Sequence, residues 1–111
     1  MTKLSTKERT RLLSVAKKFG TPLYVYDAQT ITTQCEKLKR NFGKTAFHYA
    51  MKANSNPEIL KIVRRAGFGV EAVSLGELTL ALSNGFKPVN ISFTCSNLTE
   101  TELIEAGKSG A

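Results

Sequence analysis

A chain of 111 residues with 41% hydrophobic and 23% charged residues has the composition of a folded globular domain rather than of a disordered segment. No apolar run approaches the roughly 20 residues that a membrane-spanning helix needs. The net charge of +7 is uneven, because residues 1–44 hold ten Lys or Arg and three acids, whereas residues 45–111 hold six of each. We interpret this excess as a solvated helix face. A nucleic-acid-binding arm is the weaker alternative, because no aromatic residues lie among the charges of residues 3–18.

The first twenty residues are basic, rich in Ser and Thr and poor in acids, which is also the composition of a transit peptide. An ordinary helix is the better interpretation, because Ser5 and Glu8 form the S-x-x-E pattern of a capping box. Lys17 and Lys18 suit the last turn of such a helix, and Gly20 supplies its end. The apolar residues between them are predicted to share one face: Leu12, Leu13, Ala16 and Phe19.

After Gly20, the segment Leu23–Tyr26 is predicted to be a strand, and residues 28–40 are predicted to be helical. A regular alternation of strands and helices then begins. The predicted strands are 45–51, 68–73 and 89–94, and the predicted helices are 57–66, 75–83 and 100–106. Each of these helices has a capping side chain before it and a glycine at its end: Asn56 and Gly67, Ser74 with Glu77 and Gly85, and Thr99 with Glu102 and Gly107.

Three successive β-α units of this length are typical of an α/β protein with a parallel sheet. Three units cannot close a barrel, and they leave an open sheet edge. We therefore expect the incomplete start of a (β/α)8 barrel, with a leading helix, strand and helix in residues 1–44 and the first three β-α units in residues 45–111. A small flavodoxin-like or other open α/β domain that is complete at this length is the alternative.

Cys35 and Cys95 are the only cysteines of the chain. Because no secretory signal precedes them, they suggest free thiols in a reducing, cytoplasmic compartment. Neither cysteine has the spacing of a metal ligand, and the chain has a single histidine, so we do not expect a zinc site.

Lys52 is the first candidate for chemistry. In the strand predicted for residues 45–51, the bulky apolar residues Phe47, Tyr49 and Met51 are predicted to pack under the surrounding helices. The alternate residues are predicted to face a barrel interior: Ala46, His48, Ala50 and Lys52. Lys52 would then lie at the carboxyl end of the strand, where barrel enzymes place their active sites. A partly desolvated lysine loses its proton more easily and can attack a carbonyl group. From position alone, a lysine that extends into solvent is the more common case.

Two carboxylates follow the second predicted strand. Glu71 and Glu77 could orient a cationic ring nitrogen, a substrate amine or another catalytic group. The plainer interpretations are that Glu71 is solvated and that Glu77 only completes the capping box with Ser74. His48 is predicted to be a packed or hydrogen-bonded interior residue rather than a catalytic base.

Three segments together resemble one enzyme family. Tyr49–Asn56 (YAMKANSN) resembles the cofactor-lysine motif of the alanine-racemase-like barrel decarboxylases, which are pyridoxal 5'-phosphate (PLP) enzymes acting on diaminopimelate, ornithine and arginine. Phe19–Asp27 (FGTPLYVYD) resembles the stretch that precedes this motif in diaminopimelate decarboxylases, and Glu71–Leu78 (EAVSLGEL) resembles the second-strand motif. The order and spacing of the three motifs are specific, and the resemblance extends from about Leu12 to Ala106.

The resemblance implies a PLP cofactor, with Lys52 as the lysine that forms its Schiff base and later moves protons. It implies cofactor-binding positions at Glu71, where the family usually has Asp, and at Glu77. The implied reaction is decarboxylation of an amino acid, most specifically of meso-diaminopimelate to L-lysine, by a full-length homodimer. We expect neither nucleic acid nor a membrane as a partner.

The turn Thr94–Thr99 departs from the family pattern, with Cys95 at a glycine position and Leu98 at a lysine position. In the family the cofactor-stacking histidine, which His48 does not match, and the glycine-rich phosphate loop lie further downstream. We therefore expect the 111 residues alone to be inactive and poorly stable. The alternatives are a decarboxylase for ornithine, arginine or a carboxylated polyamine, a non-catalytic PLP-binding protein, and a basic nucleic-acid-binding module that uses Lys17 and Lys18.

Overall fold

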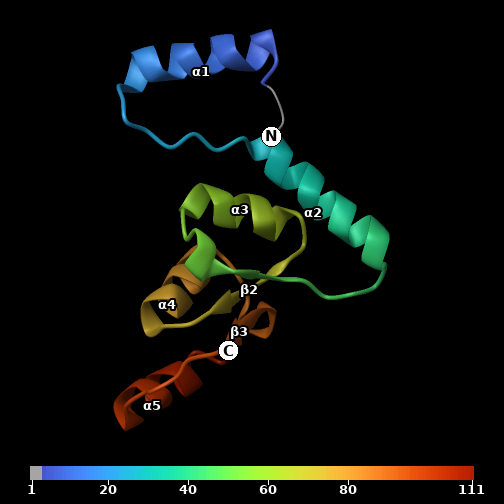
Figure 1. Cartoon of the computed structure of the whole chain (residues 1–111). Coiled ribbons are helices and arrows are strands. Elements are labelled where there is room, and N and C mark those ends of the chain that lie inside the picture. The colour runs from blue at the N-terminus through green and yellow to red at the C-terminus, as the bar shows by residue number, and fades with distance from the viewer. Residues whose placement is uncertain (1–3) are drawn as a thin grey trace.

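The computed structural model describes residues 4–111 and consists of three parallel strands that alternate with helices (Figure 1). Residues 1–3, which belong to the segment with a transit-peptide composition, lie outside the described part. The elements in chain order are α1 (Thr6–Phe19), α2 (Ala28–Phe42), β1 (His48–Ala50), the 3-10 turn η1 (Met51–Ala53), α3 (Pro57–Arg65), β2 (Gly69–Ala72), α4 (Leu75–Ser83), the 3-10 turn η2 (Pro88–Asn90), β3 (Ile91–Phe93) and α5 (Glu100–Lys108). The predicted α/β class is confirmed.

The helix starts follow the local patterns of the sequence. The capping boxes of Ser5 with Glu8 and of Thr99 with Glu102 are both complete, with each glutamate carboxylate accepting from the backbone N–H of its capping residue. The prediction for the end of α5 was wrong, because the helix continues through Gly107 to Lys108. The left-handed turn that ends the segment is at Gly110, whose φ is 77°.

The strand predicted for Leu23–Tyr26 does not form. The segment lies outside the helices and strands of the described residues, and Tyr24 is 89% exposed. No backbone hydrogen bond in residues 4–111 joins this segment to a neighbour. A strand needs a partner for its N–H and C=O groups, so apolar β-branched and aromatic residues alone did not produce one.

The sheet has the order β1-β2-β3, with both pairs parallel. Tyr49 lies opposite Val70, and Val70 lies opposite Ile91. All three strands begin later and end earlier than predicted, since only three or four residues of each find partners across the sheet.

One face of the sheet holds the core. Val70 and Ala72 of β2 are fully buried together with Leu60 of α3 and Ala81 of α4. A second buried cluster joins α2 to α3 and to the residue before β2: Cys35, Ile59, Val63 and Phe68. The opposite face of the sheet is uncovered in the described residues, and it carries His48, Glu71 and Ser92. A closed barrel would enclose this face.

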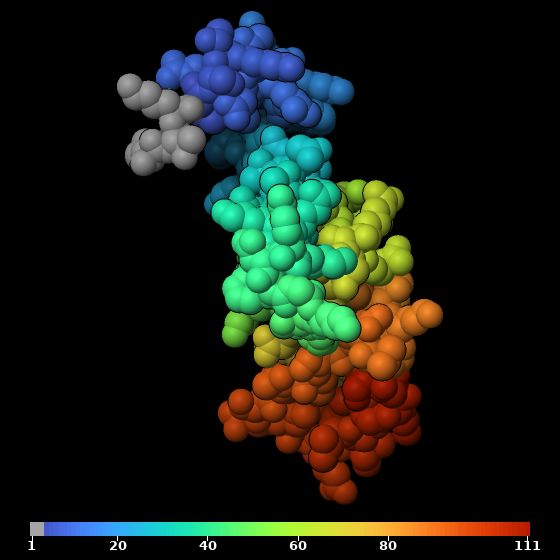
Figure 2. Space-filling model, turned by 90° about the vertical axis from the view of Figure 1, so that its right-hand side faces the viewer, coloured from blue at the N-terminus to red at the C-terminus, as the bar shows by residue number. Residues whose placement is uncertain are grey.

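The molecule is elongated, with extents of 53 × 37 × 24 Å, and α1 and α5 lie at opposite ends (Figure 2). The shared apolar face predicted for α1 is only partly covered. Leu12 and Ala16 are half-buried, whereas Leu13 and Phe19 are 64% and 69% exposed. Among the described helices, none combines the length and the apolar character needed to cross a bilayer.

Candidate functional site

The carboxyl ends of the three parallel strands meet at one edge of the sheet, and Lys52 lies at this edge. Ala50, Glu71 and Ser92 are opposite one another on neighbouring strands, so they form one row across the uncovered face, which we call a level. Lys52 follows two residues after Ala50, and its side chain is exposed. The sequence prediction that Lys52 ends the strand itself was wrong, because the ladder stops at Ala50 and the chain turns into η1.

The turn that carries Lys52 is held on both sides. Met51, immediately before it, has no exposed surface. After it, the Tyr49 hydroxyl donates a hydrogen bond of 3.0 Å to the backbone oxygen of Asn54. Burial raises the pKa of the Tyr49 phenol above its ordinary value. Sequence reasoning treated Tyr49 only as an apolar packing residue, although a tyrosine in a core position usually finds a partner for its hydroxyl.

Two hydrogen bonds between residues close in sequence extend this arrangement to the start of α3. The Asn56 N–H donates to Asn54 Oδ1 at 3.0 Å, and the Glu58 N–H donates to Asn56 Oδ1 at 2.9 Å. The second of these is the predicted cap of α3 by Asn56, which is confirmed. The loop between Lys52 and α3 is therefore ordered by its own asparagines.

Glu71 and Glu77, the two predicted carboxylates, lie in different environments. Glu71 is half-buried on the uncovered face, and it forms no ion pair with Lys52 in the described residues. Glu77 is half-buried at the start of α4, where its N–H donates to Ser74 Oγ at 3.1 Å. Its carboxylate accepts from the N–H of Val73 at 2.8 Å, so the predicted reciprocal box with Ser74 is only half formed.

His48 lies one level before Ala50 on the same face, opposite Gly69. A Cβ atom at Gly69 would be 2.7 Å from His48 Cδ2 and 2.4 Å from the backbone oxygen of Asn90. The imidazole therefore lies over Gly69, and only a glycine allows this approach. His48 was predicted to be a packed or hydrogen-bonded interior residue. In the described residues its ring packs against Gly69, but the side chain is exposed on the uncovered face rather than enclosed in an interior.

The turn after β3 brings Cys95 to the same edge of the sheet. Its thiol is half-exposed and lies 3.5 Å from the backbone oxygen of Ser96. Asn97 has a φ of 61°, which allows the chain to reverse before α5. Both cysteines are free, as predicted, and burial raises the pKa of Cys35.

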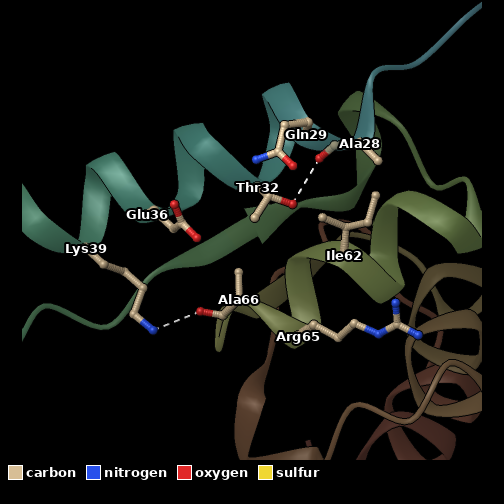
Figure 3. A pocket seen from close by; sticks show the side chains of 8 residues that line it. All are labelled: Ala28, Gln29, Thr32, Glu36, Lys39, Ile62, Arg65 and Ala66. Atoms are coloured by element: carbon tan, nitrogen blue, oxygen red, sulfur yellow. Dashed lines mark hydrogen bonds between the residues drawn. The ribbon is translucent and has the colours of Figure 1, made fainter.

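A hollow with a volume of about 510 Å³ lies elsewhere, between α2 and α3 (Figure 3). Two polar side chains of its lining are engaged within the protein, since Lys39 Nζ donates to the Ala66 backbone oxygen at 2.9 Å and Thr32 Oγ1 donates to that of Ala28 at 2.9 Å. None of the predicted site residues lines it. The candidate site is therefore an open face in the described residues, and no group of three potential metal ligands gathers there.

A family model, the pyridoxal-dependent decarboxylase, pyridoxal binding domain, matches residues 28–111. The chain belongs to this family. Diaminopimelate decarboxylase of Aquifex aeolicus is 39% identical over 89% of this chain and 24% of the relative, and that of Deinococcus radiodurans is 38% identical over 93% and 27%. A decarboxylase of Niallia circulans that acts on an L-glutamyl-[BtrI acyl-carrier protein] is 36% identical over 93% of this chain and 24% of the relative. The chain thus spans about a quarter of the length of these curated relatives.

Solved structures agree on the fold. A crystal structure from Aquifex aeolicus matches with a TM-score of 0.83 and 39% identity, covering 89% of this chain and 25% of that chain. Helicobacter pylori diaminopimelate decarboxylase complexed with L-lysine matches with a TM-score of 0.78 and 30% identity, covering 89% and 26%. The three β-α units match the N-terminal part of decarboxylase barrels, which confirms the predicted fold class and disfavours a flavodoxin-like domain.

Proposed function

We propose that these residues form the cofactor-binding start of a PLP-dependent decarboxylase that converts meso-diaminopimelate to L-lysine. The observation that carries the proposal is Lys52, an exposed primary amine at the carboxyl edge of the sheet, on a turn fixed by buried Met51 and by the Tyr49 hydroxyl. The family match and the names of the curated relatives support the choice of reaction and substrate.

The residues at this edge suit PLP by their chemistry. A primary amine condenses with an aldehyde, so Lys52 Nζ would hold the cofactor covalently. Glu71 supplies a carboxylate on the neighbouring strand, and the small Ala50 opposite it leaves room on the face between them. When bound, PLP supplies an electron sink for the electron pair that remains after loss of carbon dioxide. Lys52 Nζ would then carry protons at this edge, while Glu71 and Glu77 orient the groups around it.

The rest of the proposal depends on the resemblance. Residues 1–111 would be the N-terminal part of a PLP-binding barrel domain in a cytoplasmic homodimer, with a small amino acid as substrate and neither nucleic acid nor a membrane as partner. A related ornithine or arginine decarboxylase is the alternative within the class. A solved lysine/ornithine decarboxylase of Vibrio vulnificus matches with a TM-score of 0.92, but at 24% identity this similarity concerns the fold alone.

The test uses the whole polypeptide that carries these residues, loaded with PLP and then reduced with borohydride. We expect the cofactor mass on the peptide that contains Lys52, and we expect Lys52→Ala to lower decarboxylation of meso-diaminopimelate by on the order of a thousandfold or more. Lys61→Ala is the matched control, because Lys61 is a nearby lysine paired with Glu58 at 2.6 Å outside the site.

Three results would contradict parts of this proposal. Cofactor mass on another lysine would remove Lys52 from its role. Faster turnover of ornithine, arginine or a carboxylated polyamine than of meso-diaminopimelate would reassign the substrate. Bound PLP without turnover of any of these amino acids would favour the non-catalytic PLP-binding alternative.

A further inference from the structure

Tyr49 is a residue for which the proposed chemistry has no direct use. Its backbone lies in β1 opposite Val70, and its ring is half-buried between the two core clusters. It therefore lies on the core side of the sheet, whereas Lys52 is exposed in the η1 turn beyond the carboxyl end of β1. Tyr49 cannot reach a ligand on the uncovered face, so any effect on the site must act through the chain between them.

The hydroxyl of Tyr49 provides such a link. It donates to the backbone oxygen of Asn54 at 3.0 Å, which closes a loop of the chain that contains Met51, Lys52 and Ala53. Met51 is fully buried and anchors the amino side of this loop, while the bond to Asn54 anchors the carboxyl side. Lys52 and Ala53 are the exposed residues between these two fixed points.

We propose that Tyr49 is a positioning residue, which holds the η1 turn so that the Lys52 amine projects from the carboxyl edge of the sheet toward its substrate or cofactor. This inference depends on the function proposed above for Lys52. The precision of placement matters, because a misplacement of about 1 Å can lower a rate by about a hundredfold. A hydrogen bond within the half-buried core of the domain is a stiffer constraint than a solvated loop would provide.

The alternative is that the Tyr49 hydroxyl only pairs with a carbonyl in the core and has no effect on Lys52. The two roles differ in which residues are destabilised when the hydrogen bond is removed. If Tyr49 serves only packing, its removal weakens the sheet generally; if it positions η1, the effect is concentrated on the residues around Lys52. The raised pKa of the phenol keeps the hydroxyl protonated, and hence a donor, throughout the neutral range.

The test compares Tyr49→Phe with Thr45→Val in the whole polypeptide. Phenylalanine keeps the ring and removes only the hydroxyl. Thr45 is the matched control, because its hydroxyl also donates to a backbone carbonyl, that of Phe42 at 2.9 Å, but before the start of β1 and away from Lys52. Amide hydrogen exchange, resolved by residue, reports on the turn whether or not the cofactor is bound.

For Tyr49→Phe we expect exchange of the amides of residues 52–54 to become about fivefold to tenfold faster, as the loss of one hydrogen bond predicts. The amides of β2 should change little. In the loaded enzyme kcat should fall by about tenfold to a hundredfold, with KM changing by less than about threefold. Thr45→Val should change neither the exchange of residues 52–54 nor kcat.

Unchanged exchange at residues 52–54 in Tyr49→Phe, or exchange that rises equally across β2, would overturn the inference. So would faster exchange of the turn with an unaltered kcat. If the parent protein neither binds PLP nor decarboxylates any amino acid, the proposed function fails, but the exchange comparison still decides whether Tyr49 fixes the turn.

Discussion

At the scale of single residues, Glu77 connects the end of a strand to the start of a helix. Its N–H donates to Ser74 Oγ as the S-x-x-E pattern predicts, but its carboxylate accepts from Val73 rather than from Ser74. Val73 is the first residue after β2, so its N–H lies beyond the end of the strand and the carboxylate supplies a partner. Glu77 therefore orders the turn that follows Glu71, and its cofactor-binding role stays a prediction.

The first prediction at this scale concerns the Val73 N–H. Glu77→Ala removes its half-buried partner, so we expect a loss of about 1–3 kcal/mol in the free energy of unfolding, whereas Glu77→Gln, which retains an oxygen, should cost about 1 kcal/mol or less. Urea unfolding of the whole polypeptide measures both. Glu105→Ala, at an exposed position of α5, is the control, and equal costs for all three variants would show that the Val73 bond does not contribute.

At the scale of elements, the close approach of the three strands depends on Gly69. The residue is buried on a face that is otherwise open, because the His48 ring and the Asn90 carbonyl lie against it. His48 belongs to β1, and Asn90 immediately precedes β3. Any side chain at position 69 would push these neighbours away from β2 and disturb the level at which Ala50, Glu71 and Ser92 meet.

The prediction at this scale is that the same substitution, Gly to Ala, has opposite effects on stability at two positions. Gly69→Ala places a Cβ 2.4 Å from the Asn90 oxygen, so we expect a destabilisation of about 1–3 kcal/mol from overpacking. Gly107→Ala lies inside α5 with nothing within 4 Å of its Cβ, so we expect a stabilisation of about 0.5–1 kcal/mol. Thermal unfolding of the two variants compares them, and a neutral Gly69→Ala would contradict the close approach.

At the scale of the whole molecule, the described residues leave much apolar and strand-edge surface uncovered. Tyr24 is 89% exposed, Val89 is 83% exposed and Leu103 is 61% exposed. The sheet has an uncovered face and two edges in these residues, which are surfaces that favour pairing with another chain. The core consists of two modest clusters, so little apolar burial is available to offset the conformational entropy of ordering the chain.

We therefore predict that the 111-residue chain, purified alone, shows no decarboxylation above the uncatalysed rate and unfolds at a lower temperature than the whole polypeptide. It should also associate at micromolar concentrations through its open edges. Assays for carbon dioxide release, thermal unfolding and sedimentation check the three parts. Measurable turnover of meso-diaminopimelate by the purified chain would contradict the first of them.

Local patterns predicted the helices well because a helix start depends on residues three or four positions apart. The capping boxes at Ser5 and Thr99 and the asparagine cap of α3 all formed as their sequences indicate. Lys52 was identified by a combination of motifs that resemble a family, since its position alone favoured a solvated lysine. The alternation of Phe47, Tyr49 and Met51 also predicted which face of β1 is buried.

The sequence by itself determined the order of the helices and of the three paired strands, the residues that cap the helix starts, and the family, because these depend on neighbours in the chain or on a pattern of residues. Only the tertiary structure decided where the strands end, that Leu23–Tyr26 pairs with nothing described, and that His48 lies over Gly69. It also decided that the Tyr49 hydroxyl reaches Asn54 around the turn of Lys52. Strand pairing and the close approach of neighbouring strands need partners that the fold brings from other parts of the chain. A local sequence pattern does not identify those partners.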